Sequence, residues 1–328
     1  MQDTIIIAGI DTSKAELDIA IHGSDTCWQV DNTSAGFKLL AARLAKAKVA
    51  KVGIEATGGY EQGVVRHLRK CGFQVLVLQP LQVKAVARLK LKRAKNDRID
   101  AFLIAACTAL IEPHEIEPDQ RLDEPAHHLT FVEQIEEDIV RFKTRLEHIH
   151  DKRRRAIASR DIARLETRRA AELARIAKGL RQHDDLARRL ELVTSVDGIG
   201  ERTAIALIVR MPELGRITRE QAAALAGLAP FDTWLVASAA SRDGNDSGER
   251  KGLRSIAGGR ARLRRSLYAA AQPAAFFWNT ALKQLYQRLT KAGKPHKLAL
   301  TACARKLLVY ANTVLARGTP WVQETCPA

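Results

Sequence analysis

Hydrophobic and polar positions in the first part of the chain follow patterns typical of strands. Ile5–Asp11 is a continuous apolar run that ends in a carboxylate, as expected for a strand buried on both faces. Glu16–His22 and Cys27–Asn32 alternate apolar and polar residues, and turn residues at 23–25 separate them. The pattern therefore predicts a buried first strand followed by an antiparallel hairpin.

Helical and strand patterns then take turns up to residue 110. The predicted elements are a helix at 34–46, a strand at 49–56, a helix at 61–70, a strand at 73–79 and a helix from 96 or 97 to about 110. Strands connected by helices, after an antiparallel start, predict an α/β layered sheet.

Helical periodicity dominates the rest of the chain, after prolines at 113, 118 and 125 mark the end of a first domain. Apolar residues next recur at alternating spacings of four and three, which predicts a heptad seam: Ile135, Ile139, Phe142, Leu146 and Ile149. The seam is core, either within a helical hairpin or between subunits, and we favour contact between subunits.

Residues 192–211 are predicted to form two helices joined by a turn at Gly198-Ile199-Gly200. A helix-hairpin-helix uses such a turn to hold a DNA phosphate on the amides of its second helix, and an ordinary helical turn is the equal alternative. A capping box at Thr218 and Gln221 starts another helix, and further helices are predicted within 263–271, 282–289 and 298–315.

The charge balance adds a partner class to this picture. The 328 residues carry a formal net charge of +16, which favours a polyanion such as nucleic acid. Five scattered cysteines without a C-x-x-C pair indicate neither a zinc site nor a disulfide framework, and they suit a reducing cytoplasm. We expect no signal peptide, because the N-terminus lacks a charged n-region and an A-x-A site. We also expect no membrane-spanning segment, because no apolar run has the required length.

Basic residues gather in three places. The runs at 82–95 and 152–189 are either solvated helix faces or phosphate contacts, and we favour phosphate. The third run surrounds two hydroxyls: Ser247 precedes Gly248 and Lys251, and Ser255 lies between Arg254 and Arg260, close to Arg262. Guanidinium groups and glycine amides hold phosphate well, so in isolation this segment reads as a phosphate-binding loop with structural serines.

Four carboxylates occupy positions that suit metal binding. Asp11 and Glu55 each end a predicted strand, whereas Asp97 and Asp100 face the same way on the first turn of a predicted helix. Asp97 alone would be explained equally well as a helix cap. Together the four acids supply the oxygen ligands that Mg²⁺ prefers, and a pair of such ions can hold the attacking and leaving oxygens of a phosphodiester.

Several short motifs resemble one known family. D-T-S-K at 11–14, E-A-T-G at 55–58 and D-R-I-D-A at 97–101 look like the RuvC-like, ribonuclease H-fold domain of the DEDD insertion-sequence transposases. G-L-A-P-F-D at 227–232, D-S-G at 246–248 and G-G-R at 258–260 look like the C-terminal transposase domain of that family. The resemblance implies that Asp11, Glu55, Asp97 and Asp100 bind Mg²⁺ and that Ser247 is the nucleophile, while Ser255 has no such role.

The resemblance also implies an architecture and a set of partners. The fold class is α/β plus all-α, with a RuvC-like metal-binding domain at 1–113, a long helical coiled-coil segment at 114–190 and a helical transposase domain at 191–328. The activity is Mg²⁺-dependent DNA recombination through a phosphoserine, in a bacterial cytoplasm, by a homo-oligomer (dimer or tetramer) with a structured noncoding bridge RNA. We expect nucleic acid to contact Lys251, Arg254, Arg260, Arg262, Gly198 and Gly200.

One segment departs from the family pattern. The family passes almost directly from Phe231 to the D-S-G motif, whereas Thr233–Gly244 is inserted here and carries Ser238 and Ser241. The insertion keeps open the alternative of an inactive nucleic-acid-binding remnant. A second alternative is a metal-dependent nuclease that resembles a Holliday-junction resolvase, in which the same acids act with water as the nucleophile and Ser247 only holds phosphate.

Overall fold

The computed structural model describes residues 5–89, 97–111, 119–232, 254–256 and 258–322. The chain divides into two compact units, Met1–Glu115 and Ile116–Ala328. The division lies beside the predicted domain end at residue 113. The predicted boundary at residue 190 does not separate compact units, because helices on both sides of it share one core.

The described part of the first unit is built on a five-stranded sheet with the order β3-β2-β1-β4-β5. The strands are β1 (Ile6–Thr12), β2 (Glu16–Ile21), β3 (Cys27–Asp31), β4 (Val49–Glu55) and β5 (Gln74–Leu78). The first three strands pair antiparallel, whereas β4 pairs parallel with both β1 and β5. The predicted α/β sheet with an antiparallel start is therefore confirmed.

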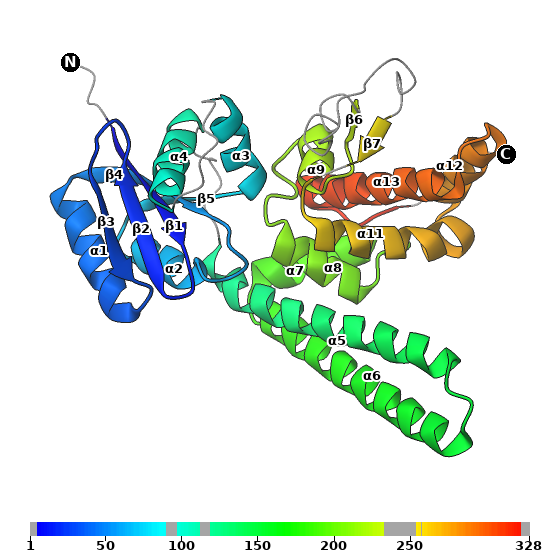
Figure 1. Ribbon diagram of the computed structural model, residues 1–328. Coiled ribbons are helices and arrows are strands. Elements are labelled where there is room, and N and C mark those ends of the chain that lie inside the picture. Colours follow the sequence, from blue (N-terminus) through cyan, green and yellow to red (C-terminus); the bar gives the residue numbers. More distant parts are fainter. Residues whose placement is uncertain (1–4, 90–96, 112–118, 233–253, 257, 323–328) are drawn as a thin grey trace, which may run out of the picture. The chain divides into compact units, whose positions relative to one another are not determined.

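Helices cover both faces of this sheet (Figure 1). They are α1 (Ser34–Lys46), α2 (Gln62–Lys70), α3 (Pro80–Leu89) and α4 (Asp97–Leu110). One core cluster combines apolar residues of α1 and α2 with those of β1, β2 and β4, such as Ile10, Leu40 and Leu68. A second cluster joins α3, α4 and β5 through residues such as Val86 and Ile104.

Helix α4 lies directly on two glycines of the central strands. Gly9 of β1 and Gly53 of β4 are paired in register. A Cβ on Gly9 would overlap the backbone of Ala101 and Ala105, and one on Gly53 would overlap the side chain of Thr108. Side chains of neighbouring strand residues point to opposite faces of the sheet. The residues two positions before and after each glycine in β1 and β4 therefore also lie on the face that α4 covers.

A buried lysine fixes the other end of α4. Lys51 is two residues before Gly53 and therefore on the same face of β4, with 7% of its surface exposed. Its Nζ donates to the backbone oxygen of Thr108 at 2.8 Å and to that of Ile111. Carbonyls at the end of a helix have no partner within it, so this ammonium both satisfies them and complements the helix dipole.

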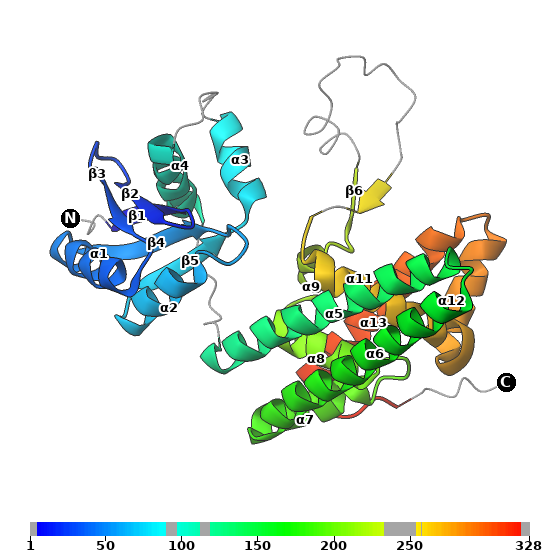
Figure 2. The ribbon, with the colours of Figure 1, turned by 60° about the horizontal axis from the view of Figure 1, so that its bottom comes forward.

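A long helical hairpin begins the second unit. Helices α5 (Asp123–Glu147) and α6 (Lys152–Arg181) follow the short η1 (Gln120–Leu122) and run side by side in both views (Figures 1 and 2). Ile135 and Ile139 are each 4% exposed and pack with Ile162 of α6 in the same chain. The heptad seam is thus buried within the hairpin, which corrects our preference for a contact between subunits. Ile149, the last predicted seam residue, lies in the connection after α5.

The remaining helices form the main core of this unit. They are α7 (Asp184–Thr194), α8 (Glu201–Arg210), α9 (Arg219–Leu225), α11 (Ala261–Pro273), the π-helix η2 (Ala274–Trp278), α12 (Thr280–Lys291) and α13 (His296–Arg317). The base of the hairpin joins the same core through residues such as Leu129 and Ile176. Among the described residues, Cys27, Cys71, Cys107 and Cys303 are free thiols, and burial raises the pKa of Cys303 to about 11.

Helix α13 corrects one expectation. In the described part of the chain it is one helix whose length and composition would allow it to cross a membrane. Half of its most apolar stretch is buried within the unit, where residues such as Leu300, Leu307 and Ala311 pack in the core. The apolar character of α13 is therefore explained by its contacts with α7, α9, α11 and α12.

A short strand pair was not predicted. Strands β6 (Pro230–Asp232) and β7 (Arg254–Ile256) are antiparallel, and Asp232 pairs with Arg254. The pairing brings the two ends of segment 233–253 together, although that segment lies outside the described residues.

The contact of α4 with Gly9 gives the first testable prediction. A Gly9→Ala substitution forces the helix and strand backbones apart, and we expect it to cost roughly 2–3 kcal/mol of local stability. Hydrogen exchange, followed by mass spectrometry on peptides of β1 and α4, measures this loss directly. The matched change Gly179→Ala, in α6 with open space around it, should leave those peptides unaffected. Unchanged protection of β1 and α4 in the Gly9 variant would contradict the packing.

Candidate catalytic and nucleic-acid-binding residues

Asp11 and Glu55 lie at the same edge of the sheet. They end adjacent parallel strands, and each follows directly on the registered pair Ile10 and Ile54. Asp11 is two residues after Gly9, and Glu55 is two residues after Gly53, so both side chains are on the face that α4 covers. Both are half-buried, and Asp11 Oδ1 accepts a hydrogen bond from the Thr12 amide at 2.9 Å.

The negative charge of Glu55 affects the pKa of a thiol on α4. The pKa of Cys107 is raised above its ordinary value, first by burial and second by the negative charge of Glu55. Since Cys107 belongs to α4, the Glu55 carboxylate lies within electrostatic reach of that helix.

The two remaining acids belong to the first turn of α4. Asp100 is half-buried and precedes Ala101, the residue whose carbonyl lies against Gly9. Asp97 is the first residue of the helix, but its side chain lies outside the described residues. Within the described residues there is no group of three His, Cys, Asp or Glu side chains arranged to hold a metal ion.

The residues at this edge nevertheless fit a hard divalent cation. Asp11, Glu55 and Asp100 offer only oxygen ligands, and each keeps part of its surface exposed. Mg²⁺ binds through one or two carboxylates and retains several waters, so partly exposed carboxylates at a strand edge suit it better than a closed cage would. A thiolate-binding metal is not favoured, because the nearby Cys107 is buried with a raised pKa.

A further acid, which the sequence analysis did not single out, orders the loop after Glu55. Glu61 is 8% exposed, and its Oε2 accepts hydrogen bonds from the Thr57 amide at 3.2 Å, the Thr57 hydroxyl at 3.1 Å and the Gly59 amide at 2.8 Å. Gly58 and Gly59 both have positive φ, which lets the loop close around this carboxylate. Glu61 therefore holds the backbone that follows Glu55.

The Gly198-Ile199-Gly200 turn connects α7 and α8, as predicted. Gly198 has φ +99°, and a Cβ there would overlap Ala274 of η2. Asn279 Nδ2 donates to the Asp197 carbonyl at 3.1 Å and ties the turn to the start of α12. Gly200 is the exposed N-cap of α8, but the next residue, Glu201, is an acid paired with Arg181 at 2.6 Å. Tight packing explains Gly198, and a phosphate contact at this turn stays a prediction.

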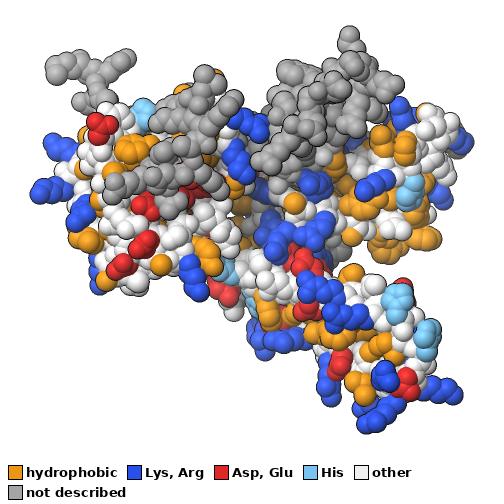
Figure 3. All heavy atoms as spheres, viewed as in Figure 1, with side chains coloured by type: hydrophobic (Ala, Val, Ile, Leu, Met, Phe, Trp, Pro, Cys, Tyr) orange, Lys and Arg blue, Asp and Glu red, His pale blue; other side chains and the backbone are white. Residues whose placement is uncertain are grey.

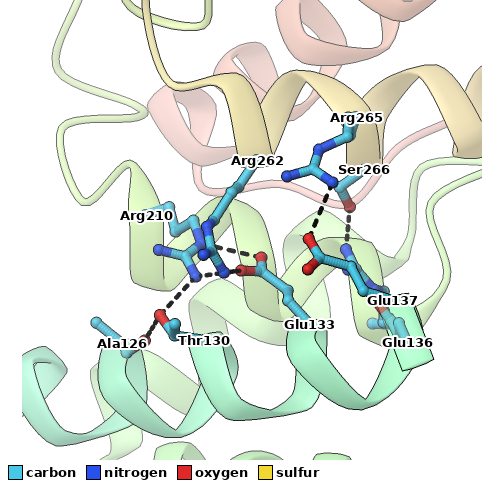
Figure 4. A network of polar contacts seen from close by, with 10 residues as sticks. Ala126, Thr130, Glu133, Glu136, Glu137, Arg210, Arg262, Arg265 and Ser266 are labelled. Atoms are coloured by element: carbon cyan, nitrogen blue, oxygen red, sulfur yellow. Dashed lines mark hydrogen bonds and ion pairs between the residues drawn. The ribbon is translucent and has the colours of Figure 1, made fainter. Parts of the chain in front are cut away.

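Three glutamates of α5 pair with arginines of α8 and α11 (Figure 4). The innermost is Glu133, which is 6% exposed and accepts from Arg210 of α8 at 2.6 Å and from Arg262 of α11 at 2.7 Å. Burial lowers the pKa of Arg210, and the Glu133 charge opposes that shift. Buried guanidinium and carboxylate groups need such partners, because an unpaired charge there would be costly.

The other two glutamates extend the same contact. Glu136 accepts from Arg202 at 2.5 and 3.0 Å, and Arg202 also donates to the Ser266 hydroxyl at 2.5 Å. Glu137 pairs with Arg265 at 3.2 Å, where both side chains are more exposed. Together these contacts fix α5 on α8 and α11.

Two of the arginines expected to bind nucleic acid therefore have partners in the chain. Arg262 pairs with Glu133, and Arg260 forms a two-bond pair with Glu213 at 2.5 and 2.9 Å. About a third of each arginine side chain stays exposed. A contact of these two residues with nucleic acid stays a prediction, and their ion pairs give each of them a structural role.

Two of the recognised motifs touch one another. Gly227 and Gly259 both have positive φ, and a Cβ on Gly227 would overlap the Gly258 carbonyl. The Arg260 amide donates to the Leu225 carbonyl at 2.8 Å, and Arg264 donates to the Gly258 carbonyl at 2.5 Å. This close backbone contact joins the end of α9 to the start of α11, beside β6 and β7.

The predicted nucleophile belongs to the segment between those strands. Ser247, Lys251 and the insertion Thr233–Gly244 lie outside the described residues, as does the side chain of Arg254. The backbone of Ser255 is in β7, opposite Phe231.

Comparisons with known proteins agree with the recognised motifs. A family model described as "Transposase" matches residues 8–151, and one described as "Transposase IS116/IS110/IS902 family" matches residues 190–287. The pilin gene-inverting proteins of Moraxella bovis and Moraxella lacunata are each 25% identical to this chain over 339 residues. These matches cover 95% of this chain and 96% of each relative.

Solved structures of RuvC from Thermus thermophilus, one of them in complex with a Holliday junction substrate, are 19% identical. They cover 32% of this chain and 93% of their own, with a TM-score of 0.26.

The ion pairs of Glu133 give the second prediction. Glu133→Gln removes the charge that Arg210 and Arg262 share, and we expect the unit to lose about 3 kcal/mol because two guanidinium groups remain without a counter-charge. Urea unfolding followed by the helical circular dichroism signal measures the loss. The control Glu137→Gln breaks a more exposed pair and should cost less than about 1 kcal/mol. Equal effects of the two changes would contradict the assignment of Glu133 as the central contact.

Proposed function

The chain belongs to the IS116/IS110/IS902 family of transposases, and on that premise we propose that it recombines DNA in a Mg²⁺-dependent reaction with a serine nucleophile. The family membership makes it a transposase or recombinase; the metal, the nucleophile and the guide are our inference. The observation that carries the metal assignment is the common orientation of Asp11 and Glu55 toward α4, whose first turn bears Asp97 and Asp100.

Each acid has a defined role in this proposal. Asp11, Glu55, Asp97 and Asp100 would hold Mg²⁺, with Glu61 fixing the loop behind Glu55. Bound Mg²⁺ supplies charge stabilisation to the phosphodiester and lowers the pKa of a coordinated hydroxyl. The acids are all hard oxygen donors, which matches this ion and disfavours softer ones.

The covalent step uses the Ser247 hydroxyl. Its Oγ attacks the phosphorus of a DNA phosphodiester, a bond from Oγ to phosphorus forms, and the bond from phosphorus to the 3′ oxygen breaks. The serine proton leaves to a base and the departing 3′ oxygen gains a proton. A 3′ hydroxyl of another strand then attacks the phosphoserine and restores the serine. Each step replaces one phosphate ester bond by another, so no cofactor that supplies energy is required.

The relatives and the net charge of +16 support DNA as the substrate. The names of the two Moraxella proteins state that they invert a pilin gene, which is a site-specific rearrangement. We extend that class of reaction to this chain. We also propose that a structured noncoding bridge RNA selects the sites by base pairing and that the active form is a homo-oligomer, either a dimer or a tetramer.

A suicide DNA substrate tests the proposal. A nick placed beside the cleavage position lets a short product strand leave, so that the phosphoserine cannot be reversed and protein remains attached to DNA. Because the sites are unknown, the substrate library is built from the DNA that flanks the gene, and the assay contains RNA transcribed from the same flanks. The wild-type chain with Mg²⁺ should give an adduct that survives denaturing electrophoresis. Ser247→Ala should reduce it at least 1000-fold, and Asp11→Ala should do so too, because each removes a group that the chemistry requires.

Matched controls separate this function from its alternatives. Ser255→Ala, a nearby serine in β7, should retain the adduct. Mg²⁺-dependent cleavage without any adduct would instead identify a nuclease that uses water. DNA and RNA binding without cleavage, unaffected by Asp11→Ala, would identify an inactive remnant and refute the proposal.

A further inference from the structure

Tyr60 is an exposed aromatic residue at the edge of the sheet where Asp11 and Glu55 end their strands. It lies in the loop between β4 and α2, and 51% of its surface is exposed. An exposed tyrosine alone is common on a protein surface. Tyr60 differs from such a residue because its backbone is firmly held and because the candidate metal ligands lie at the same edge.

The loop that presents Tyr60 is built around a buried carboxylate. Glu61 is 8% exposed, and its side chain accepts one hydrogen bond from the Gly59 amide and two from Thr57. Gly58 is exposed and has a φ of +82°, and a Cβ added there would meet no other atom within 4 Å. The loop is therefore ordered from inside, while its outer backbone stays open to a ligand.

A second side chain ties Tyr60 to the strand that carries Asp11. Asn32, which follows β3, donates through Nδ2 to the Tyr60 carbonyl at 3.2 Å and to the Ser13 carbonyl at 2.8 Å. One amide nitrogen thus joins the loop after Glu55 to the turn after Asp11. A ring that projects from such a base loses little conformational freedom when a ligand packs on it.

The turn after Asp11 presents Lys14 at the same edge. The Ser13 amide donates to the Glu16 carbonyl at 2.9 Å, and the Glu16 amide donates to the Ser13 hydroxyl at 2.9 Å. Lys14 is exposed within this closed turn. Its ammonium group is therefore carried on an ordered backbone three residues after Asp11.

Acids predominate on the neighbouring strands. Asp11 pairs in register with Asp18 of β2, so both side chains are on one face of the sheet, and Gln29 of β3 donates to Asp18 and to Glu16. Figure 3 shows Asp and Glu side chains over the strands of the first unit. Such a surface repels phosphate, so a nucleic acid held at this edge needs attractive contacts that offset the repulsion.

A ring and a cation at this edge suit one kind of ligand. An unpaired nucleotide offers a base with a π-face to the ring and a phosphate to the ammonium group. A continuous duplex hides its base faces in the stack, so it would satisfy Lys14 but not Tyr60.

We propose that Lys14 and Tyr60 bind the DNA strand next to the phosphodiester that is cut. A base of that strand stacks on the Tyr60 ring, and Lys14 contacts an adjoining phosphate. The inference rests on the proposed function, in which Asp11 and Glu55 bind Mg²⁺ at this edge and cut strands leave their duplex. Both residues hold the substrate and take no part in the bond changes.

Photocrosslinking tests the stacking contact without cleavage. A single DNA strand of about 16 nucleotides carries 5-iodouracil in place of thymine, which on irradiation bonds to an aromatic side chain stacked on it. The full chain binds this strand with Ca²⁺ in place of Mg²⁺, so that the charge of the acids is offset. After digestion with trypsin, we expect a crosslinked nucleotide on the peptide 52–66, in which Tyr60 is the one aromatic residue.

Variants separate the ring from the charge. Tyr60→Leu should remove this crosslink and weaken binding at least about fivefold, because stacking contributes roughly 5- to 150-fold per base. Tyr60→Phe keeps the ring and should bind within about twofold of the wild-type chain. Lys14→Ala should reduce the slope of log K against log salt by about 0.7, the value for one phosphate of a single strand. The control Leu39→Ala, an exposed apolar residue of α1, should change neither measurement.

Three results would overturn the proposal: crosslinks confined to other peptides, an unchanged affinity of Tyr60→Leu, or equal weakening by Tyr60→Leu and Tyr60→Phe. A crosslink on peptide 52–66 that forms with RNA of the same sequence but not with DNA would overturn the assignment to DNA. The Ser247 adduct reports separately on the proposed function. A chain that forms the adduct without the crosslink keeps the reaction and refutes the contact, whereas the reverse keeps the contact and refutes the reaction.

Discussion

The contact between α4 and two glycines of the central strands sets the geometry of the first unit. Gly9 and Gly53 let the helix backbone approach the sheet at a distance that any side chain would prevent. The same alternation that puts these glycines under α4 puts Asp11 and Glu55 on that face, two residues further along. Lys51, two residues earlier, holds the other end of the helix through its last carbonyls. One close packing contact therefore puts Asp11 and Glu55 on the face that α4 covers, and the first turn of that helix carries Asp100.

Charge is used in two different ways in the second unit. Around Glu133, Glu136 and Glu213, arginines are paired and partly buried, and they hold α5, α8 and α11 together. Along α12 the basic residues have no acid beside them in the sequence and remain exposed. The net charge of the chain thus counts two kinds of basic residue together: arginines whose ion pairs support the fold, and exposed lysines and arginines that have no acid beside them in the sequence. Clustering in the sequence did not separate these two cases, because the partners are far away along the chain.

The local pattern of apolar and polar residues was sufficient to predict most of the helices and strands. The alternating and apolar runs located all five strands of the sheet, and the capping box at Thr218 and Gln221 is present with both hydrogen bonds. Periodicity also located the seam of Ile135 and Ile139, but it could not tell whether the facing helix belonged to the same chain, since either arrangement buries the same residues. Strands β6 and β7 were missed because three residues are too few to show a period.

Side-chain roles that depend on distant partners were not predictable. Glu61 looks like an ordinary first-turn acid, and only the folded loop brings the amides of Thr57 and Gly59 to its carboxylate. Lys51 reads as a polar residue in a strand, although it is buried against the end of α4. The sequence predicts Arg262 as a phosphate contact, whereas in the fold it pairs with Glu133, which lies 129 residues earlier in the chain. For Asp11 and Glu55 the sequence did indicate a common edge of the sheet, because the carboxyl ends of adjacent parallel strands meet there.

We propose that Asp11, Glu55 and the two acids in the first turn of α4 form one divalent-cation site. Iron-mediated backbone cleavage tests it directly, because Fe²⁺ replaces Mg²⁺ at carboxylate sites and, with ascorbate and peroxide, cuts the chain only near the bound ion. We predict cuts close to Asp11, to Glu55 and to the first turn of α4, suppressed by excess Mg²⁺ and lost in Asp11→Asn. Cuts confined to other segments, or cuts at these positions that neither Mg²⁺ nor the substitution reduces, would contradict a shared site.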